Sequence, residues 1–244
     1  MSKVKIVIPA RLGSTRLKNK MLLDICGEPL IVRTYKTALE FGYKDVIVAC
    51  DSNEIKKEIE KCGGKAILTD PSLPSGTDRV HAAMKEIYAS DDDIIVNFQG
   101  DHPYISSSFI RESIKLLEET DADIATPITK IESDAYMRES VVKVACTFFS
   151  EKYAKAHYFS RALIPHGGPY YQHVGVYVYR MKTLREFISL PQSSLEKSEK
   201  LEQLRALESG MKINVALIDE FPPLSIDTQE DMETVIKFIN NIDI

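Results

Sequence analysis

A chain of 244 residues with a net charge of −5 has no basic field to attract nucleic acid or anionic lipid, so neither is expected as a partner. Its 44% hydrophobic and 27% charged residues fit a globular protein, large enough for one α/β domain over residues 1–244. No stretch approaches the roughly 20 apolar residues of a membrane span, and the N-terminus lacks a signal-peptide pattern, so we expect a cytoplasmic protein. The four cysteines show no C-x-x-C spacing, which argues against a cysteine metal site.

Strands and helices are predicted to alternate along the first half of the chain. Apolar runs rich in β-branched residues predict buried strands at residues 4–9, 46–50, 66–69, 93–98 and 124–127. Helices are predicted at residues 29–41, 51–62, 78–89 and 107–119. Asp51 and Glu54 are interpreted as a capping box that opens the second of these helices. Such an alternation with short connections predicts a doubly wound, mostly parallel sheet.

The second half of the chain has a less regular pattern. Longer strands are predicted at residues 141–148 and 172–179, on either side of a segment full of turn residues. A helix at residues 195–208, a strand at 212–218 and an amphipathic helix at 228–239 follow. We therefore expect a β-rich lobe at approximately residues 130–190, inserted within the single domain.

The loop after the first strand concentrates cations. It contains four cations with small residues between them: Arg11, Arg16, Lys18, Lys20, Gly13, Ser14 and Thr15. Sheets of this kind bind ligands beyond the carboxyl ends of their strands, and a donor-rich loop there suits a triphosphate. Neither the Walker A pattern nor the G-x-G-x-x-G fingerprint is present. The alternative interpretation is a solvated basic loop.

Two aspartates from distant segments are candidate metal ligands. Asp101 directly follows the fourth strand, where a carboxylate projects into the ligand crevice and can hold Mg²⁺ against phosphate oxygens. Asp227 lies just before the last helix. Sharing one Mg²⁺, they would fit a metal-assisted attack on phosphorus. The alternatives are a turn residue for Asp101 and a helix N-cap for Asp227.

A second small-residue segment lies between the third strand and its helix. Ser75, Gly76 and Thr77 are small enough for the backbone to approach a flat base closely, and Arg79 can meet a phosphate. The alternative is that these residues only cap the helix.

Seven segments of the chain occur in the order of one known family. They are IPARLGSTRLKNK, SGTDR, VNFQGDHP, YFSRALIP, HVGVYVYR, EKLEQLRALESG and IDTQED. From residue 8 to about residue 231, the chain resembles the 3-deoxy-manno-octulosonate cytidylyltransferases, also called CMP-Kdo synthetases. The resemblance implies a glycosyltransferase-A-like nucleotidyltransferase fold and a homodimer, with the β-rich lobe serving sugar binding and dimerisation. It also implies Mg²⁺-dependent transfer of CMP from CTP to the eight-carbon keto-acid sugar Kdo, for bacterial lipopolysaccharide biosynthesis.

The same resemblance implies a role for each matching residue. The CTP-binding residues would be Arg11, Ser14, Arg16, Lys20, Ser75, Gly76, Thr77 and Arg79. Asp101 and Asp227 would hold Mg²⁺ and, with Lys20, form the catalytic set. The residues around the sugar would be Gln99, Arg161, His173, Tyr177, Glu202 and Gln203. Arg161 would grip the sugar carboxylate through a bidentate fork. Without the family match, His173 would be interpreted as a buried histidine and Glu202 as part of a solvated helix face.

Three departures from the family pattern concern the loop and the sugar. Lys18 and Asn19 stand where the usual R-L-P-G-K loop has Pro and Gly, His102 replaces a usual Glu, and the stretch between Pro165 and Gln172 is short. The alternative substrates are the 8-amino analogue of Kdo and a sialic-acid-type nonulosonate. Outside enzymes, the alternative is a degenerate nucleotide-binding regulatory module. That class predicts loss of the metal carboxylates or the loop lysine, all of which are present.

Overall fold

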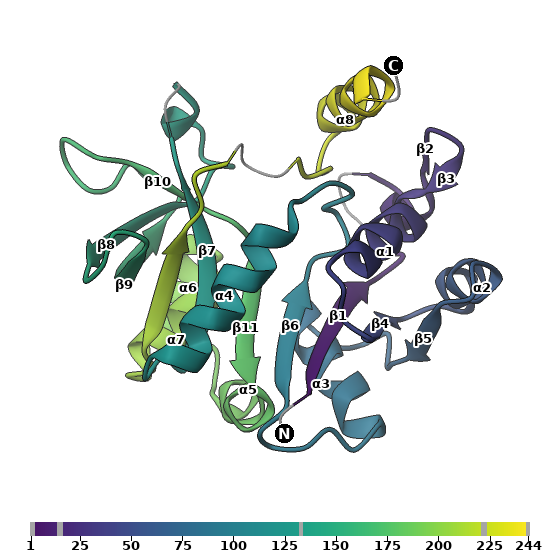
Figure 1. Ribbon diagram of the computed structural model, residues 1–244, viewed down its shortest axis with the longest axis horizontal. Helices are drawn as coiled ribbons and strands as arrows, with labels where there is room; N and C mark the ends of the chain where they lie inside the picture. Colours follow the sequence, from purple (N-terminus) through teal and green to yellow (C-terminus); the bar gives the residue numbers. More distant parts are fainter. Residues whose placement is uncertain (1–2, 14–16, 132–133, 221–223, 243–244) are drawn as a thin grey trace. The chain divides into compact units, whose positions relative to one another are not determined.

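A computed structural model describes residues 3–13, 17–131, 134–220 and 224–242. The chain forms two compact units, one of Met1–Ser106 with Pro223–Ile244 and the other of Ser107–Pro222 (Figure 1). The β-rich lobe expected at residues 130–190 falls within the second unit, and the single-domain organisation stays a prediction. None of the helices in the described ranges is long and apolar enough to cross a membrane.

The first unit is built on a parallel sheet. Its strands, in spatial order, are β5 (Lys65–Leu68), β4 (Asp45–Cys50), β1 (Val4–Ala10) and β6 (Ile94–Phe98). Ile6 in β1 pairs with Val46 on one side and Val96 on the other, and all three are 5% exposed or less. Burial on both faces explains why these strands appear in the sequence as continuous apolar runs. The four predicted strands are confirmed.

Helices of the first unit cover both faces of this sheet. They are α1 (Leu30–Glu40), α2 (Asn53–Lys61) and α3 (Gly76–Glu86). A further helix of this unit, α8 (Gln229–Ile242), packs its Phe238 ring against Tyr104. The chain steps outward from β1 to β4 to β5 through α1 and α2, then returns through α3 to β6. Right-handed crossovers therefore place α3 on the face opposite α1 and α2 (Figure 1). A short antiparallel pair, β2 (Asp24–Ile25) with β3 (Glu28–Pro29), was not predicted.

The predicted capping box at Asp51 is wrong. Ser52 is the N-cap of α2, and its hydroxyl accepts a hydrogen bond from the backbone N–H of Ile55 at 3.2 Å. Asp51 lies one residue too early to cap the helix. Its carboxylate instead accepts a hydrogen bond from the backbone N–H of Leu12 at 3.0 Å. Asp51 therefore anchors the loop that follows β1.

The second unit contains a mostly antiparallel sheet. Its strands are β7 (Ile124–Lys130), β8 (Lys143–Phe148), β9 (Tyr153–Ser160), β10 (Tyr171–His173), β11 (Val176–Arg180) and β12 (Ile213–Leu217). Their pairing order is β10-β8-β9-β12-β7-β11, and β10 also pairs with β7, which closes a ring of strands. The pair β7–β12 is parallel, whereas β8–β9, β9–β12, β7–β10, β8–β10 and β7–β11 are antiparallel.

The second unit corrects two sequence predictions. The strand expected at residues 172–179 is divided into β10 and β11, and β9 was not predicted. The helix expected at residues 195–208 is two helices, α6 (Ser194–Glu199) and α7 (Gln203–Glu208), divided at Lys200 with a φ of 56°. A buried ion pair holds the two halves together, because the Arg205 guanidinium donates to both carboxylate oxygens of Glu196 at 2.9 and 2.7 Å. The other elements are α4 (Ser107–Glu119), α5 (Met181–Ser189) and a 3₁₀ turn, η2 (Asp134–Met137).

Candidate active site

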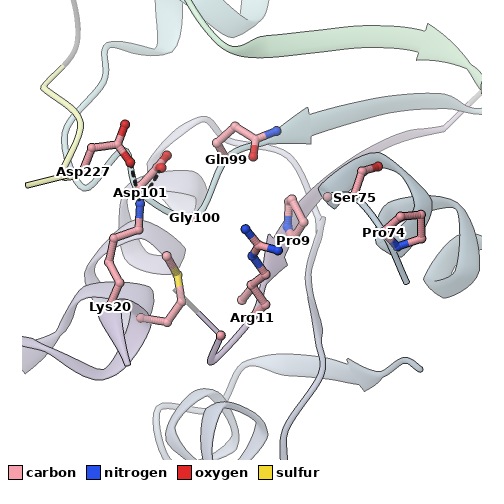
Figure 2. A pocket seen from close by; sticks show the side chains of 13 residues that line it. Pro9, Arg11, Lys20, Pro74, Ser75, Gln99, Gly100, Asp101 and Asp227 are labelled. Carbon is pink, nitrogen blue, oxygen red and sulfur yellow. Dashed lines mark hydrogen bonds and ion pairs between the residues drawn. The ribbon is translucent and has the colours of Figure 1, made fainter. Parts of the chain in front are cut away.

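A cavity of about 400 Å³ lies in the first unit at the carboxyl ends of β1 and β6 (Figure 2). Several sequence-predicted residues line it: Arg11, Lys20, Ser75, Gly76, Gln99, Asp101 and Asp227. Pro9, Gly13, Met21, Pro74 and Gly100 also contribute to the lining. The position agrees with the general rule that parallel sheets bind ligands beyond the carboxyl ends of their strands.

Lys20 joins the two candidate metal carboxylates. It begins a short 3₁₀ helix, η1 (Lys20–Leu22), and is only 8% exposed. Its ammonium Nζ lies 2.9 Å from Asp101 Oδ2 and 3.0 Å from Asp227 Oδ1, as the dashed lines of Figure 2 show. Three charged groups from distant parts of the sequence therefore meet at one point.

A backbone contact brings Asp227 to Asp101 although the two residues are far apart in sequence. The backbone N–H of Ile226 donates to the carbonyl oxygen of Asp101 at 3.0 Å. An isolated antiparallel bridge between Tyr104 and Leu224 lies next to this hydrogen bond. The segment before α8 is thus fixed along the segment after β6, and position 227 is held beside position 101.

The electrostatics keep Lys20 and Asp101 ionised. Burial lowers the pKa of Lys20, but the attraction of Asp101 and Asp227 outweighs it, and the pKa lies above the ordinary value. Burial raises the pKa of Asp101, but His102 and Lys20 together bring it below its usual value. At neutral pH Lys20 is therefore an ammonium and Asp101 a carboxylate.

The two carboxylates have the chemistry and spacing to hold one divalent cation. Among the described residues, no group of three or more His, Cys, Asp or Glu side chains is placed to hold a metal. Mg²⁺ is commonly bound by only one or two carboxylates, with substrate phosphates and water completing its coordination. Asp101 and Asp227 each have an oxygen within 3.0 Å of the same atom, Lys20 Nζ, so both carboxylates can bind one cation that lies between them. The donor chemistry of this pair therefore suits Mg²⁺.

The start of α3 forms another wall of the cavity. Ser75 is the N-cap of this helix, and its hydroxyl accepts from the backbone N–H of Asp78 at 3.1 Å. The backbone at Gly76 is close to β1, because a Cβ there would lie 3.3 Å from Pro9 Cγ and 3.6 Å from Gln99 Oε1. Ser75 therefore caps the helix and also lines the cavity, and the contact of this segment with a base stays a prediction.

Thr77 and Arg79 do not line the cavity. Thr77 is 4% exposed, and its hydroxyl accepts from the Asn97 amide at 3.1 Å. Arg79 is 2% exposed and donates to Thr69 Oγ1 at 2.6 Å and to the backbone carbonyl of Asp70 at 3.2 Å. These contacts fasten α3 to the ends of the strands. Ser14 and Arg16, two other expected CTP ligands, lie outside the described residues.

Gly100 was not singled out in the sequence, although its lack of a side chain shapes the cavity floor. A Cβ at this position would lie 3.0 Å from both Met21 Sδ and the backbone carbonyl oxygen of Pro9. We expect Gly100→Ala to lower the free energy of unfolding by about 1 to 3 kcal/mol, because the added methyl group overpacks the floor. Urea denaturation measures this change. Gly13→Ala is the control, since a Cβ there meets nothing within 4 Å; equal stabilities of the two variants would contradict the prediction.

Four of the predicted sugar residues form a cluster in the second unit. The Tyr177 hydroxyl donates to Gln203 Oε1 at 3.0 Å, and the ring centroids of Tyr177 and His173 are 5.3 Å apart. His173 Nε2 also shares a hydrogen bond with Thr126 Oγ1 at 2.9 Å. Burial and the nearby Glu202 raise the pKa of Tyr177 well above its ordinary value, so its hydroxyl stays a neutral donor.

The amide of Gln203 is the strongest sign of a ligand in this cluster. Gln203 is 4% exposed, and its Nε2 has no hydrogen-bond acceptor within the part of the chain that the structure describes. A buried donor without an acceptor costs free energy, and a bound hydroxyl or carboxylate would supply the missing partner.

Arg161, the fifth sugar residue of this unit, is fixed by backbone carbonyls. Its Nε donates to the carbonyl oxygen of Glu199 at 3.0 Å, and its Nη1 donates to that of Glu139 at 3.1 Å. The Glu199 carboxylate in turn accepts from the Arg161 backbone N–H at 2.9 Å and from Ser160 Oγ at 2.7 Å. Glu199 was not predicted as a site residue, because its partners Ser160 and Arg161 lie 39 and 38 positions away along the chain.

Comparison with known proteins gives consistent matches over nearly the whole chain. A family model described as cytidylyltransferase matches residues 5–213. A 3-deoxy-manno-octulosonate cytidylyltransferase of Parvibaculum lavamentivorans is 46% identical over 231 residues, which cover 93% of this chain and 89% of the relative. The enzyme of the same name from Rickettsia massiliae is 44% identical, with 98% and 96% of the two chains covered.

Two solved structures resemble the fold. A CMP:2-keto-3-deoxy-manno-octonic acid synthetase in complex with CTP has a TM-score of 0.90 and 35% identity, and the match covers 99% of this chain and 100% of the other. A cytidylyltransferase from Leptospira borgpetersenii has a TM-score of 0.65 at 20% identity, with 99% and 88% of the two chains covered, and supports the fold alone.

Proposed function

The chain belongs to the 3-deoxy-manno-octulosonate cytidylyltransferase family, and on that basis we propose that it transfers CMP from CTP to Kdo and releases pyrophosphate. The product would supply bacterial lipopolysaccharide biosynthesis. The single observation that carries the proposal is the Lys20 ammonium between Asp101 and Asp227 in the cavity of the first unit. A triphosphate and its metal ion require this combination of a cation and two carboxylates.

In the proposed mechanism, the residues of the first unit bind and orient the nucleotide. The anomeric hydroxyl of the sugar attacks the α-phosphorus and loses its proton to a carboxylate of the site or to water. An O–P bond forms, and the bond to the β-phosphate oxygen breaks to release pyrophosphate. Mg²⁺, held by Asp101 and Asp227, would neutralise charge on the phosphate oxygens. Lys20 is charged at neutral pH and would stabilise the negative charge that gathers on the departing oxygens. Catalysis would then depend mainly on positioning and electrostatics.

The second unit would recognise the sugar. Kdo carries a carboxylate and several hydroxyls, and the cluster offers donors and acceptors for both. The Gln203 Nε2 donor and the neutral Tyr177 hydroxyl would bind sugar oxygens, while Glu202 would accept from sugar hydroxyls. Arg161 would contribute a positive charge for the carboxylate, and the backbone carbonyls that hold it would fix its direction.

Three further features belong to the same proposal. We infer that Mg²⁺ is the cofactor, that two chains associate as a homodimer through the β-rich lobe, and that the enzyme acts in the cytoplasm. The family resemblance supports the dimer and the location, and the carboxylate pair supports the metal. Sedimentation equilibrium tests the dimer, and turnover after chelation of divalent cations by EDTA tests the metal.

Pyrophosphate release with CTP and Mg²⁺ is the direct test of the proposal. Kdo, its 8-amino analogue and N-acetylneuraminate are offered in parallel as acceptors. Turnover with Kdo as the preferred acceptor is expected. Preference for one of the other two sugars would support CMP transfer as the reaction but would replace Kdo as the acceptor. If protein that circular dichroism shows to be folded released no pyrophosphate with any of the three sugars, the transferase function would be refuted and a degenerate nucleotide-binding module favoured.

We expect Tyr177→Phe to raise the KM for the sugar about fivefold and to leave the KM for CTP unchanged. The substitution removes the hydrogen bond that orients the Gln203 amide, and one such bond is worth about 1 kcal/mol. Steady-state kinetics with each substrate varied in turn measures both constants. Tyr153→Phe is the matched control, because it removes a similar bond, to Glu112 at 3.1 Å, outside the cluster. Equal shifts in both KM values would contradict a role in sugar binding.

A further inference from the structure

The Lys20 ammonium lies between one carboxylate oxygen of Asp101 and one of Asp227. The distances of 2.9 and 3.0 Å from Nζ are those of strong, charge-assisted hydrogen bonds. The side chain of Lys20 is 11% exposed, whereas those of Asp101 and Asp227 are 25% and 39% exposed. The carboxylates are thus accessible to ions from solvent, and the ammonium already balances one of their two negative charges.

We propose that Lys20 acts as a placeholder for the divalent cation in the nucleotide-free protein. Its ammonium holds Asp101 and Asp227 at a separation that one metal ion can bridge, and it keeps free metal ions out. The triphosphate of CTP then draws the ammonium away, and the metal ion enters together with the nucleotide. The order of binding is the new element, and it rests on the proposed function because it takes CTP as the nucleotide.

Like-charge repulsion is the first reason for this inference. Two carboxylates whose oxygens both lie within 3.0 Å of one atom repel each other unless a cation lies between them. The nucleotide-free protein therefore needs a positive charge at this point in order to keep the site assembled. Lys20 supplies that charge from within the chain.

Competition for the same oxygens is the second reason. A divalent cation that bridges Asp101 Oδ2 and Asp227 Oδ1 must displace the ammonium, or else be repelled by it at short range. Displacement without nucleotide would leave the Lys20 charge largely buried, which is costly. A triphosphate offers the ammonium new anionic oxygens, so the exchange becomes favourable only when nucleotide is present.

The side chain of Lys20 can make such an exchange without a rearrangement of the fold. A lysine is a compact charge on a flexible stem with several rotatable bonds, so its ammonium can move while its backbone stays in place. The backbone at Lys20 is fixed independently of the side chain, because its N–H donates to the Leu17 carbonyl at 3.2 Å and its carbonyl accepts from the Leu23 N–H at 3.2 Å.

Manganese binding without nucleotide tests the proposal independently of turnover. Mn²⁺ is titrated into the nucleotide-free protein and the free ion is followed by electron paramagnetic resonance. We expect Lys20→Met to bind Mn²⁺ at least tenfold more tightly than the wild-type protein. Lys20→Arg keeps the positive charge and is expected to bind as weakly as wild type. The double variant Lys20→Met with Asp101→Asn is expected to bind Mn²⁺ no more tightly than wild type. That result would show that Mn²⁺ binds Lys20→Met through this pair of carboxylates.

Equal or weaker Mn²⁺ binding by a folded Lys20→Met variant would overturn the proposal. A second measurement avoids the need for any variant, in case the substitution prevents folding. Crystals of the wild-type protein are soaked in Mn²⁺ with and without CTP, and anomalous scattering locates the metal. A manganese ion bridging Asp101 and Asp227 without CTP would refute the placeholder, whereas a bridging ion found only with CTP would support it. Because neither measurement uses the sugar, failure of the transferase assay and failure of this proposal are distinguishable.

Discussion

The Asp101→Asn variant is expected to lose about 100- to 1,000-fold in kcat/KM, the range found when one preorganised charge-stabilising group is removed from an active site. Asparagine has nearly the same shape, so the fold should survive. The loss would follow from the charge, because an amide binds Mg²⁺ weakly and leaves Lys20 with only the carboxylate of Asp227. Pyrophosphate release at saturating Mg²⁺ measures the effect.

Asp45→Asn is the control for Asp101→Asn. Asp45 forms a similar pair with Lys5, at 3.0 Å between Oδ2 and Nζ, but it lies at the start of β4 and thus at the opposite end of the parallel strands from the cavity. Near wild-type turnover is expected for this control. Near wild-type turnover of Asp101→Asn itself, at saturating Mg²⁺, would disprove the role of Asp101 in the mechanism.

The Lys20→Met variant is expected to lose about 100- to 1,000-fold in kcat, since it removes the charge that stabilises the departing pyrophosphate. Methionine has a similar length and no charge, so it fills the same space. If Lys20 is also the placeholder, the same variant should bind Mn²⁺ more tightly without nucleotide while it turns over more slowly. A purely structural lysine would not produce these opposite changes.

Lys5→Met is the matched control for Lys20→Met. Both lysines are 8% exposed, and Lys5 also lies near two carboxylates, at 3.0 Å from Asp45 and 3.8 Å from Asp93. It belongs to the amino end of β1, away from the cavity. We expect this control to lose stability and to keep its kcat. Equal losses of kcat in the two variants would show that Lys20 acts only through the fold.

The first unit was predictable because its signals are local. A strand buried on both faces needs a continuous apolar run, and a helix that packs on a sheet needs an apolar stripe, and both patterns can be read within about ten residues. The residues of the candidate active site were also predictable, because local motifs identify them. Lys20, Asp101 and Asp227 were identified from family motifs, and the structure places all three on one cavity.

Part of the second unit also had a local signal that was overlooked. Met181, Leu184 and Phe187 recur at helical spacing along α5 and are all buried. The signal for β9 is weaker, because the buried positions along part of this strand are Ala154 and Ala156, whose side chains are small. The strand β12, with which β9 pairs, comes from a distant part of the chain, so this pairing could not be predicted from the residues around β9.

Side-chain direction was decided only by the tertiary structure. Arg79 and Thr77 have the residue types of a nucleotide site, yet both are buried against the strand ends. Similarly, Asp51 has the spacing of a helix cap and instead binds the backbone of the loop after β1. Each residue type fits more than one partner, and the choice depends on which polar groups the rest of the fold leaves nearby.

The fold class, the family and the identity of the charged residues at the site could all be read from the motifs and apolar runs of the chain. The contact of the Lys20 ammonium with Asp101 and Asp227 could not, because it depends on the hydrogen bond between Ile226 and Asp101 and on the bridge between Tyr104 and Leu224. Motifs state which groups are present, since residue types are local properties of the chain. Distances of about 3 Å between groups 81 and 207 positions apart result from the packing of the whole unit.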